Sequence, residues 1–385
     1  MYRDTIERSA RTLIISLRNI NNYVYNSCLY EFEDVIDRID EIDLLNLPNA
    51  NHVQKLKRKV LQQAVVHLSP QFANLNPSGN KAIALEKEYD ILFVIIDFPC
   101  NLLWLNLIKE WRKKCKICVC YVIEIWQEEI KLLKNNLKFL ENFDYIFLGH
   151  SQIVDSLEKL IDRPCEYLPP AIDAIKFAPK SLDSHRSIDL CSMGRRSHIT
   201  HKALLNLAEK QDFFYHYDPP RSADNLTFNH QHHRTFNANI LKHSRYFIAN
   251  RAKINVEALV KNQAEIGYRF FEGAASGTVM LGTAPDNRAF KKYFDWENVV
   301  IPMQFDEPNI AAIIAELDRQ PEYLATVRKN NIVNTLLRHD WSYRWQQILD
   351  RIGLLPNDKL FQRRTKLKEL AASIGRKKNC SNFRE

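Results

Sequence analysis

The stretch AEIGYRFFEGAASGTVMLG, residues 264–282, holds four of the nine glycines of this chain, and no glycine occurs before Gly79. Glycine concentrates where the backbone turns tightly or comes close to a ligand. A helical segment within the stretch carries Arg269 and Glu272 on one face, three residues apart. The apolar run 279–281 that follows is typical of a buried strand. The stretch therefore predicts a loop, a short helix and a strand around a charged pair, which suits a phosphate and sugar site.

Strand-like and helix-like patterns alternate over the rest of the chain, which indicates mostly parallel sheets covered by helices. A length of 385 residues exceeds the usual single core, so we expect two domains. The polar segment 180–187 has the composition of a linker between them. Predicted strands span 12–17, 42–47, 91–97, 117–123 and 145–148 before the linker, and 188–193, 213–217, 246–249, 279–282 and 299–302 after it. Predicted helices include 101–113, 127–136, 309–319, 322–337 and 341–352.

This alternation predicts an α/β fold of two doubly wound, Rossmann-like domains that face each other across a cleft. In such sheets ligands bind at the carboxyl ends of the strands. The first half lacks a glycine-rich loop after its first strand, where residues 17–20 are LRNI. A dinucleotide fingerprint needs glycines there, so the sequence disfavours dehydrogenase chemistry.

The composition, 45% apolar and 26% charged, is that of an ordinary globular protein. No apolar run approaches the ~20 residues of a membrane span. The first residues lack the layout of a signal peptide, so we expect a cytoplasmic protein. The eight cysteines lie mostly in apolar segments, which favours reduced core thiols over metal ligands.

The net charge of +8 is concentrated in residues 361–385, where eight basic side chains accompany two acidic ones. This basic tail has two interpretations. It is a solvated terminus, or it draws the protein to an anionic membrane face and makes it peripheral at the membrane. Nucleic acid is not an expected partner.

A second candidate for ligand binding follows the predicted strand 188–193, where Gly194 and Arg195 lead into a helix that carries Lys202. A glycine at a strand end, cationic side chains and a helix N-terminus together suit an anion.

Polar side chains also end three strands of the first half, and these are candidates for acceptor contacts and for a catalytic base. They are Asp97, Glu124 and His150. The cluster NHQHH at 229–233 is interpreted as a polar surface loop rather than a metal site, because it has no carboxylate partner.

The run from Gly267 to Gly282 resembles the signature of retaining GT-B glycosyltransferases, the "glycosyl transferases group 1" set, and in particular its spore-coat maturation-type branch. Weaker similarity occurs at 170–179 and at Gly194 and Arg195. The likeness covers the second half of the chain well and the first half only in its layout.

The resemblance implies a GT-B fold and transfer of a sugar, with retention, from a nucleotide-diphospho-sugar donor to a glycan, lipid-linked or protein acceptor, as in polysaccharide biosynthesis. Residues 1–180 would form the acceptor-side domain, 188–340 the donor domain, and 341–360 a helix that packs back across the junction. Such enzymes usually need no metal or other cofactor, because cations and helix dipoles stabilise the departing diphosphate.

The implied donor site comprises Gly194, Arg195, Lys202, Gly267, Tyr268, Arg269 and Glu272. Glu272 would hold the ribose, while Arg195 and Lys202 would hold the diphosphate.

The sequence also departs from the family pattern. A second glutamate, eight positions before Glu272, contacts the donor sugar in the broader family. Here Ala264 holds that position and Glu265 lies one place later, which makes Glu265 the candidate for this role. If the role is lost, the chain is a catalytically silent GT-B-like binding or assembly protein. A nucleotide-sugar epimerase of the same fold is the other alternative.

Overall fold

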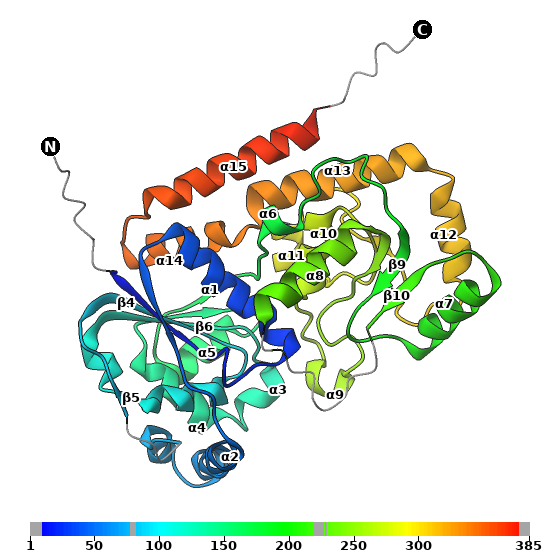
Figure 1. Cartoon of the computed structure of the whole chain (residues 1–385). Coiled ribbons are helices and arrows are strands. Elements are labelled where there is room, and N and C mark those ends of the chain that lie inside the picture. The colour runs from blue at the N-terminus through cyan, green and yellow to red at the C-terminus, as the bar shows by residue number, and fades with distance from the viewer. Residues whose placement is uncertain (1–9, 78–81, 219–226, 228, 377–385) are drawn as a thin grey trace, which may run out of the picture.

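Two α/β domains lie side by side in the computed structural model, which describes residues 10–77, 82–218, 227 and 229–376 (Figure 1). The first is built on a six-stranded parallel sheet in the order β2-β1-β4-β6-β7-β8. Its strands are β1 (Thr12–Ser16), β2 (Ile42–Asn46), β4 (Tyr89–Ile96), β6 (Cys115–Val122), β7 (Tyr145–Leu148) and β8 (Cys165–Tyr167). Its longer helices are α1 (Ser27–Ile39), α2 (His52–His67) and α5 (Val154–Ile161).

The second domain has a five-stranded parallel sheet in the order β10-β9-β11-β12-β13. Its strands are β9 (Ile188–Ser192), β10 (Tyr215–Tyr217), β11 (Ser244–Ile248), β12 (Val279–Gly282) and β13 (Ile301–Pro302). Its helices include α7 (His198–Lys210), α8 (His230–Lys242), α10 (Tyr268–Ser276), α11 (Arg288–Tyr293), α12 (Ile310–Asp318) and α13 (Pro321–Arg338). In both sheets the second strand flanks the first and the later strands extend the other way, which is doubly wound topology. The prediction of two Rossmann-like domains in a GT-B arrangement is confirmed.

The chain returns to the first domain after α13. Helix α14 (Trp341–Ile352) lies beside α1 on the first sheet. Trp341 stacks on Phe32 of α1 with ring centroids 4.4 Å apart, and Trp345 lies 5.3 Å from Phe93 of β4. Both tryptophans are fully buried. Large buried aromatic side chains dominate packing energies, so these contacts fasten the end of the chain to the domain where it began.

Two predicted helices of the first half are wrong in detail. Residues 99–107 form 3-10 turns, η3 (Pro99–Leu107), and most of this apolar run around Trp104 is buried. The short strand β5 (Ile108–Lys109) follows, and Glu110, with a left-handed backbone (φ 50°), then leads into the 3-10 helix η4 (Trp111–Lys114). The predicted helix 127–136 is broken into α3 (Gln127–Ile130) and α4 (Lys134–Leu137).

The region expected to be a basic tail begins with a packed helix, α15 (Asp358–Gly375). Leu367, Ala371 and Ile374 are buried in the core of the second domain, while Leu360 is buried against the first. Figure 1 shows α15 (red) lying along α13 and reaching over both domains. Residues 377–385 of the predicted tail lie outside the described residues. None of the described helices is long and apolar enough to cross a membrane.

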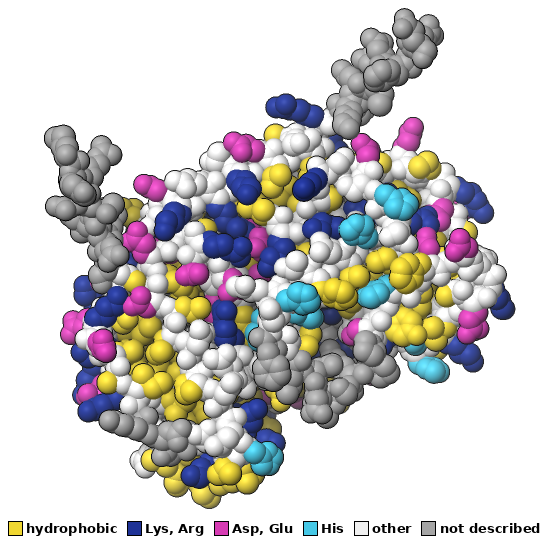
Figure 2. All heavy atoms as spheres, in the orientation of Figure 1, with side chains coloured by type: hydrophobic (Ala, Val, Ile, Leu, Met, Phe, Trp, Pro, Cys, Tyr) yellow, Lys and Arg dark blue, Asp and Glu magenta, His cyan; other side chains and the backbone are white. Residues whose placement is uncertain are grey.

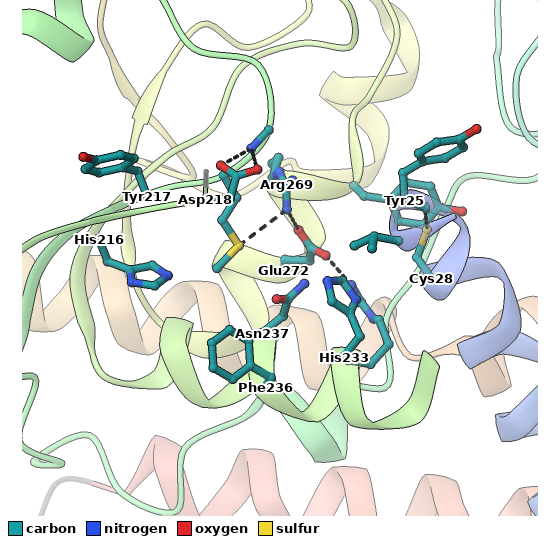
Figure 3. Close-up of a pocket in the computed structure, with 15 residues that line it drawn as sticks. Tyr25, Cys28, His216, Tyr217, Asp218, His233, Phe236, Asn237, Arg269 and Glu272 are labelled. Carbon is teal, nitrogen blue, oxygen red and sulfur yellow. Dashed lines mark hydrogen bonds and ion pairs between the residues drawn. The ribbon is translucent and has the colours of Figure 1, made fainter. Parts of the chain in front are cut away.

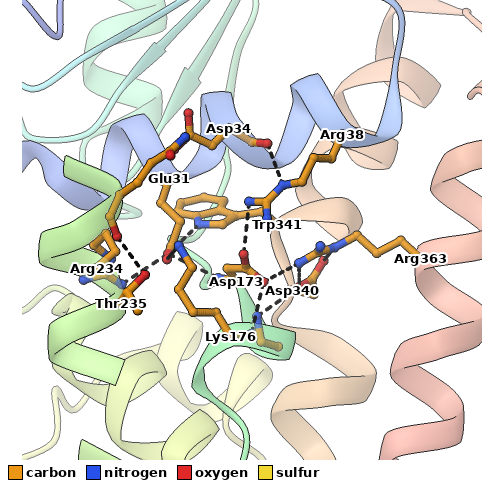
Figure 4. A network of polar contacts seen from close by, with 12 residues as sticks. Glu31, Asp34, Arg38, Asp173, Lys176, Arg234, Thr235, Asp340, Trp341 and Arg363 are labelled. Carbon is orange, nitrogen blue, oxygen red and sulfur yellow. Dashed lines mark hydrogen bonds and ion pairs between the residues drawn. The ribbon is translucent and has the colours of Figure 1, made fainter. Parts of the chain in front are cut away.

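Arg363 of α15 forms ion pairs with two buried carboxylates where the domains meet (Figure 4). Its guanidinium donates to Asp340 at 2.7 and 2.8 Å and to Asp173 at 2.7 Å. Asp173 also accepts from Arg38 of α1, at 3.1 Å. Burial opposes ionisation of Asp173, but Arg363 and Arg38 outweigh it and lower its pKa. A basic side chain that the sequence places in a tail is thus part of the junction.

Replacing Arg363 by Gln leaves Asp173 and Asp340 buried without their shared cation. We expect the free energy of unfolding of Arg363→Gln to fall by about 3 to 5 kcal/mol, measured by urea denaturation at pH 7. Lys366→Gln, an exposed position on the same helix, is the matched control and should change stability by less than about 0.5 kcal/mol. Equal stability of the two variants would contradict a structural role for Arg363.

Candidate functional site: a cavity between the domains

A cavity of about 490 Å³ lies between the two domains, beyond the carboxyl ends of β9 and β10 (Figure 3). The first domain contributes Val24, Tyr25 and Cys28, from η1 (Val24–Asn26) and the start of α1. The second domain contributes Met193, Gly194, His216, Tyr217, Asp218, His233, Arg234, Phe236, Asn237, Tyr268, Arg269 and Glu272. Strand order reverses beside β9, and such a switch point is where open α/β sheets bind ligands.

Glu272 lies in α10 at the base of this cavity, with only 2% of its surface exposed. One carboxylate oxygen accepts from Arg234 of α8, and the other accepts from Arg269 at 2.7 Å. Burial by itself would raise the pKa of Glu272, but Arg269 and Arg234 reverse the effect and hold it at about 2. The carboxylate is therefore ionised at every physiological pH.

Arg234 joins Glu272 to the first domain. It is 3% exposed, and its second terminal nitrogen donates to Glu31 of α1 at 3.2 Å. Figure 4 shows Glu31 reaching Arg234 and Lys176 from the α1 side. Because a buried cation must be compensated, Arg234 holds two carboxylates from different domains in place.

Arg269 and His233 face the cavity from opposite sides of Glu272 (Figure 3). The Arg269 side chain is 30% exposed, so its guanidinium remains accessible to a ligand. Burial, and then the charge of Arg234, lowers the pKa of His233 to about 4. Within the described part of the chain, Nδ1 of His233 is buried and has no hydrogen-bond partner. A neutral imidazole next to a guanidinium can contact a polar ligand without repelling a cation.

The turn after β9 forms the opposite wall. Gly194 has a left-handed backbone (φ 80°), which favours glycine. Its amide donates to both oxygens of Asp218, at 2.9 and 3.0 Å, and Arg196 forms an ion pair with the same carboxylate. Arg196 also lies over the ring of Tyr217, 5.4 Å from its centroid. The turn is thereby tied to the end of β10.

The structure brings together four of the residues predicted for the donor site, since Gly194, Tyr268, Arg269 and Glu272 all line the cavity. Gly267 is the N-cap of α10, next to them. Arg195 follows Gly194 in the turn, where its neighbour Arg196 is the residue that binds Asp218. Lys202 lies in α7 and lines a different groove, together with Pro308 and Ala311.

Glu265 has a different environment from that expected of a sugar contact. It is fully buried and accepts hydrogen bonds from the Ser151 amide and hydroxyl, the Gln152 amide and the Gln263 side chain. The four donors occupy the four lone-pair sites of a carboxylate. Glu265 therefore binds the turn after β7 of the first domain to the second domain.

The three strand-end candidates of the first domain are all engaged by neighbouring groups. Asp97 accepts from the side chains of Asn21, Asn26 and Asn101. Glu124 accepts from the indole of Trp126 at 2.7 Å and forms an ion pair with Lys253 of the second domain. His150 contacts the Ile125 carbonyl through Nδ1, at 2.9 Å, and lies edge-on to Trp126. Of these contacts, the ion pair of Glu124 with Lys253 joins the two domains, and the others lie within the first domain.

Sequence reasoning missed the contribution of α8. The prediction of a surface loop at 229–233 is wrong, because Asn229 caps this helix by accepting from the His232 amide. The helix places His233 and Arg234 at the cavity, and His230 bonds Ser27 of α1 at 2.9 Å. An asparagine ahead of an otherwise unbroken helical segment was the available signal.

Residues 201–350, less than half of the chain, match a family model described as "Glycosyl transferase-like". This segment contains α8 and α10 and hence most of the cavity wall. No curated protein matches the chain significantly. Among solved structures, HepE of Anabaena in complex with UDP-glucose is 10% identical over 89% of this chain and 99% of its own, with a TM-score of 0.48. A glycosyltransferase from Rickettsia africae ESF-5 is 12% identical over 89% and 98%, with a TM-score of 0.45.

The low pKa of His233 predicts that the free energy of unfolding depends on pH. The unfolded chain takes up the histidine proton near pH 6.5, whereas the folded protein takes it up only near pH 4. The free energy of unfolding should therefore fall as the pH drops from about 6.5 to 4. Urea denaturation at steps of pH will show a shallower fall for His233→Gln than for the wild type. Identical slopes for the two proteins would contradict the buried, neutral imidazole.

Proposed function

We propose that the protein is a glycosyltransferase whose cavity binds a nucleoside-diphosphate sugar. The observation that carries this proposal is Glu272, an ionised carboxylate buried at the base of an interdomain cavity. Each of its oxygens accepts from one arginine, so each keeps a lone pair for a further donor. Two adjacent ribose hydroxyls are such a pair of donors. The similarity of residues 201–350 to a glycosyltransferase-like family supports the same role.

The other cavity residues suit the remaining parts of such a donor. Arg269 is a cation that a ligand can reach. The amides in the first turn of α10 form the positive end of the helix, which can bind an anion such as a diphosphate. Both would stabilise the diphosphate as charge develops on it during transfer. Tyr217 and His216 provide ring surfaces on the far wall, where a nucleobase can pack.

We further propose that transfer proceeds with retention of configuration and without a metal ion, onto an acceptor that approaches from the first domain. The two domains already meet through Ser27 and His230, Ser151 and Glu265, and Glu124 and Lys253. Closure of the two domains around a bound donor would exclude water and so protect the donor from hydrolysis.

A catalytically silent binding protein is the second candidate. The observation that favours it is Glu265, since the carboxylate nearest to the family's sugar-contact position is fully used in joining the domains. A silent protein would bind the nucleotide without turnover. Incubation with radiolabelled donor sugars separates the two candidates, because only an enzyme releases free or transferred sugar. An epimerised donor would instead identify the third alternative, a nucleotide-sugar epimerase.

Donor binding can be tested by thermal shift with UDP, GDP, TDP and their sugars. One nucleotide should raise the melting temperature of the wild type. Arg269→Gln removes a charge-assisted bond worth about 1.5 to 3 kcal/mol, so its affinity should fall roughly 10- to 100-fold. Glu272→Gln should bind no nucleotide detectably, whereas Glu297→Gln, an exposed control, should match the wild type. Undiminished binding by Arg269→Gln would refute the assigned cavity.

Metal independence can be tested on the same preparation. Activity with the selected donor should be unchanged in excess EDTA, because Arg269 and the α10 amides supply the positive charge. Magnesium added afterwards should restore nothing. A loss of activity in EDTA that magnesium reverses would show that a cation takes part in leaving-group stabilisation.

A further inference from the structure

Helix α2 presents an apolar stripe to solvent at the lower edge of the first domain as drawn in Figure 1. Val53, Leu56 and Val60 are 58%, 56% and 64% exposed. Their spacing of three and four residues places them on one side of the helix. The opposite side is the one that packs, through the buried Val65. A single exposed apolar residue needs no explanation, but an aligned set does.

The stripe continues into the segment that follows the helix. Leu68, Phe72 and Leu75 are 72%, 37% and 52% exposed. Phe72 lies within the short turn η2 (Pro70–Asn74), which packs against α2, and Leu68 and Leu75 lie on either side of it. The same end of the molecule in Figure 2 shows apolar side chains gathered with basic ones and a histidine. We call the exposed apolar residues of α2 and 68–75 the α2 patch.

The charge around the α2 patch is of one sign. Lys55, Lys57 and Lys59 are exposed. At 3.6 residues per turn, Lys57 lies on one flank of the stripe and the other two lie on the opposite flank. From residue 44 to residue 85 the chain contains no aspartate or glutamate. A cationic helix with an apolar face is the pattern of a segment that lies in a membrane interface.

We infer that the α2 patch docks on an anionic lipid surface. Leu56 and Val60 would enter the boundary between headgroups and acyl chains, while the flanking lysines contact lipid phosphates. A second copy of the chain is a poorer occupant, because two patches face to face would bring their lysines together, and residues 44–85 contain no carboxylate to pair with them. The α2 patch is distinct from the basic tail that the composition suggested. In that tail Arg363 forms ion pairs with Asp173 and Asp340 inside the protein.

This inference goes beyond the proposed sugar transfer and does not depend on it. If both hold, an acceptor in the first domain would be presented at a membrane surface, which favours a lipid-linked acceptor over a soluble glycan. Donor binding and lipid binding are then separable, since one belongs to the interdomain cavity and the other to the α2 patch, which contributes no residue to that cavity.

The test is co-sedimentation of the full-length protein with vesicles of phosphatidylcholine alone or mixed with phosphatidylglycerol. The wild type should bind only the anionic vesicles, and less at high salt. Each lysine close to such a surface strengthens binding about fivefold. The triple variant Lys55→Gln, Lys57→Gln, Lys59→Gln should therefore bind at least tenfold more weakly. Leu56→Ser with Val60→Ser should lose binding to a similar extent.

Matched controls come from α15 and from the loop before it. Lys359→Gln, Lys366→Gln, Lys368→Gln removes three exposed lysines from another helix, and Leu355→Ser changes a residue that is 83% exposed. Both should bind vesicles like the wild type. All these changes are on the surface, and unchanged melting temperatures will verify that each variant is folded.

Three outcomes would overturn the inference. The wild type fails to bind anionic vesicles, the α15 variant loses as much binding as the α2 variant, or the α2 variants bind undiminished. A fourth would replace it: if size-exclusion chromatography shows a dimer that Leu56→Ser, Val60→Ser converts to a monomer without loss of vesicle binding, the patch is a self-association surface.

Discussion

The chain of ion pairs that runs from Glu31 through the buried Arg234 and Glu272 to Arg269 is the interaction on which the site depends. A charge in the protein interior is stable only when it is paired and hydrogen-bonded. Glu31 belongs to the first domain and the other three to the second, so the compensation is complete only when the domains are in contact. The same contact creates the cavity, and the shape of the site is therefore a consequence of how its charges are neutralised.

Two other charged or polar side chains also join structural units at the junction of the domains. Glu265 receives donors from both domains, and Arg363 joins Asp173 and Asp340 to the last helix. In each case one side chain contacts several partners that belong to more than one structural unit. These contacts fasten the two domains to each other on either side of the cavity. The α2 patch lies outside this network, and its side chains are left to solvent.

How far the sequence predicted the site can be judged from particular residues. The pair Arg269 and Glu272 was recognisable because its partners are three residues apart on one helix face. The Gly194 turn was recognisable because it follows a clear strand. The role of Arg234 could not be recognised from the sequence, because it lies 38 residues from Glu272 and 203 residues from Glu31 along the chain. Glu265 was predicted to contact a sugar, but its four donors come largely from the turn at Ser151, which no local pattern could place beside it.

The sequence by itself determined the alternation of strands and helices, the doubly wound fold class and the helix that carries Glu272. These features follow from periodicity and from glycine, which act over a few neighbouring residues. Only the tertiary structure decided which cations neutralise Glu272 and which face of α2 is left exposed. It also decided that α15 packs against both domains instead of forming a solvated tail. The role of an ionisable or apolar side chain depends on its burial and on the groups within a few ångströms, and the fold brings those groups from distant parts of the chain.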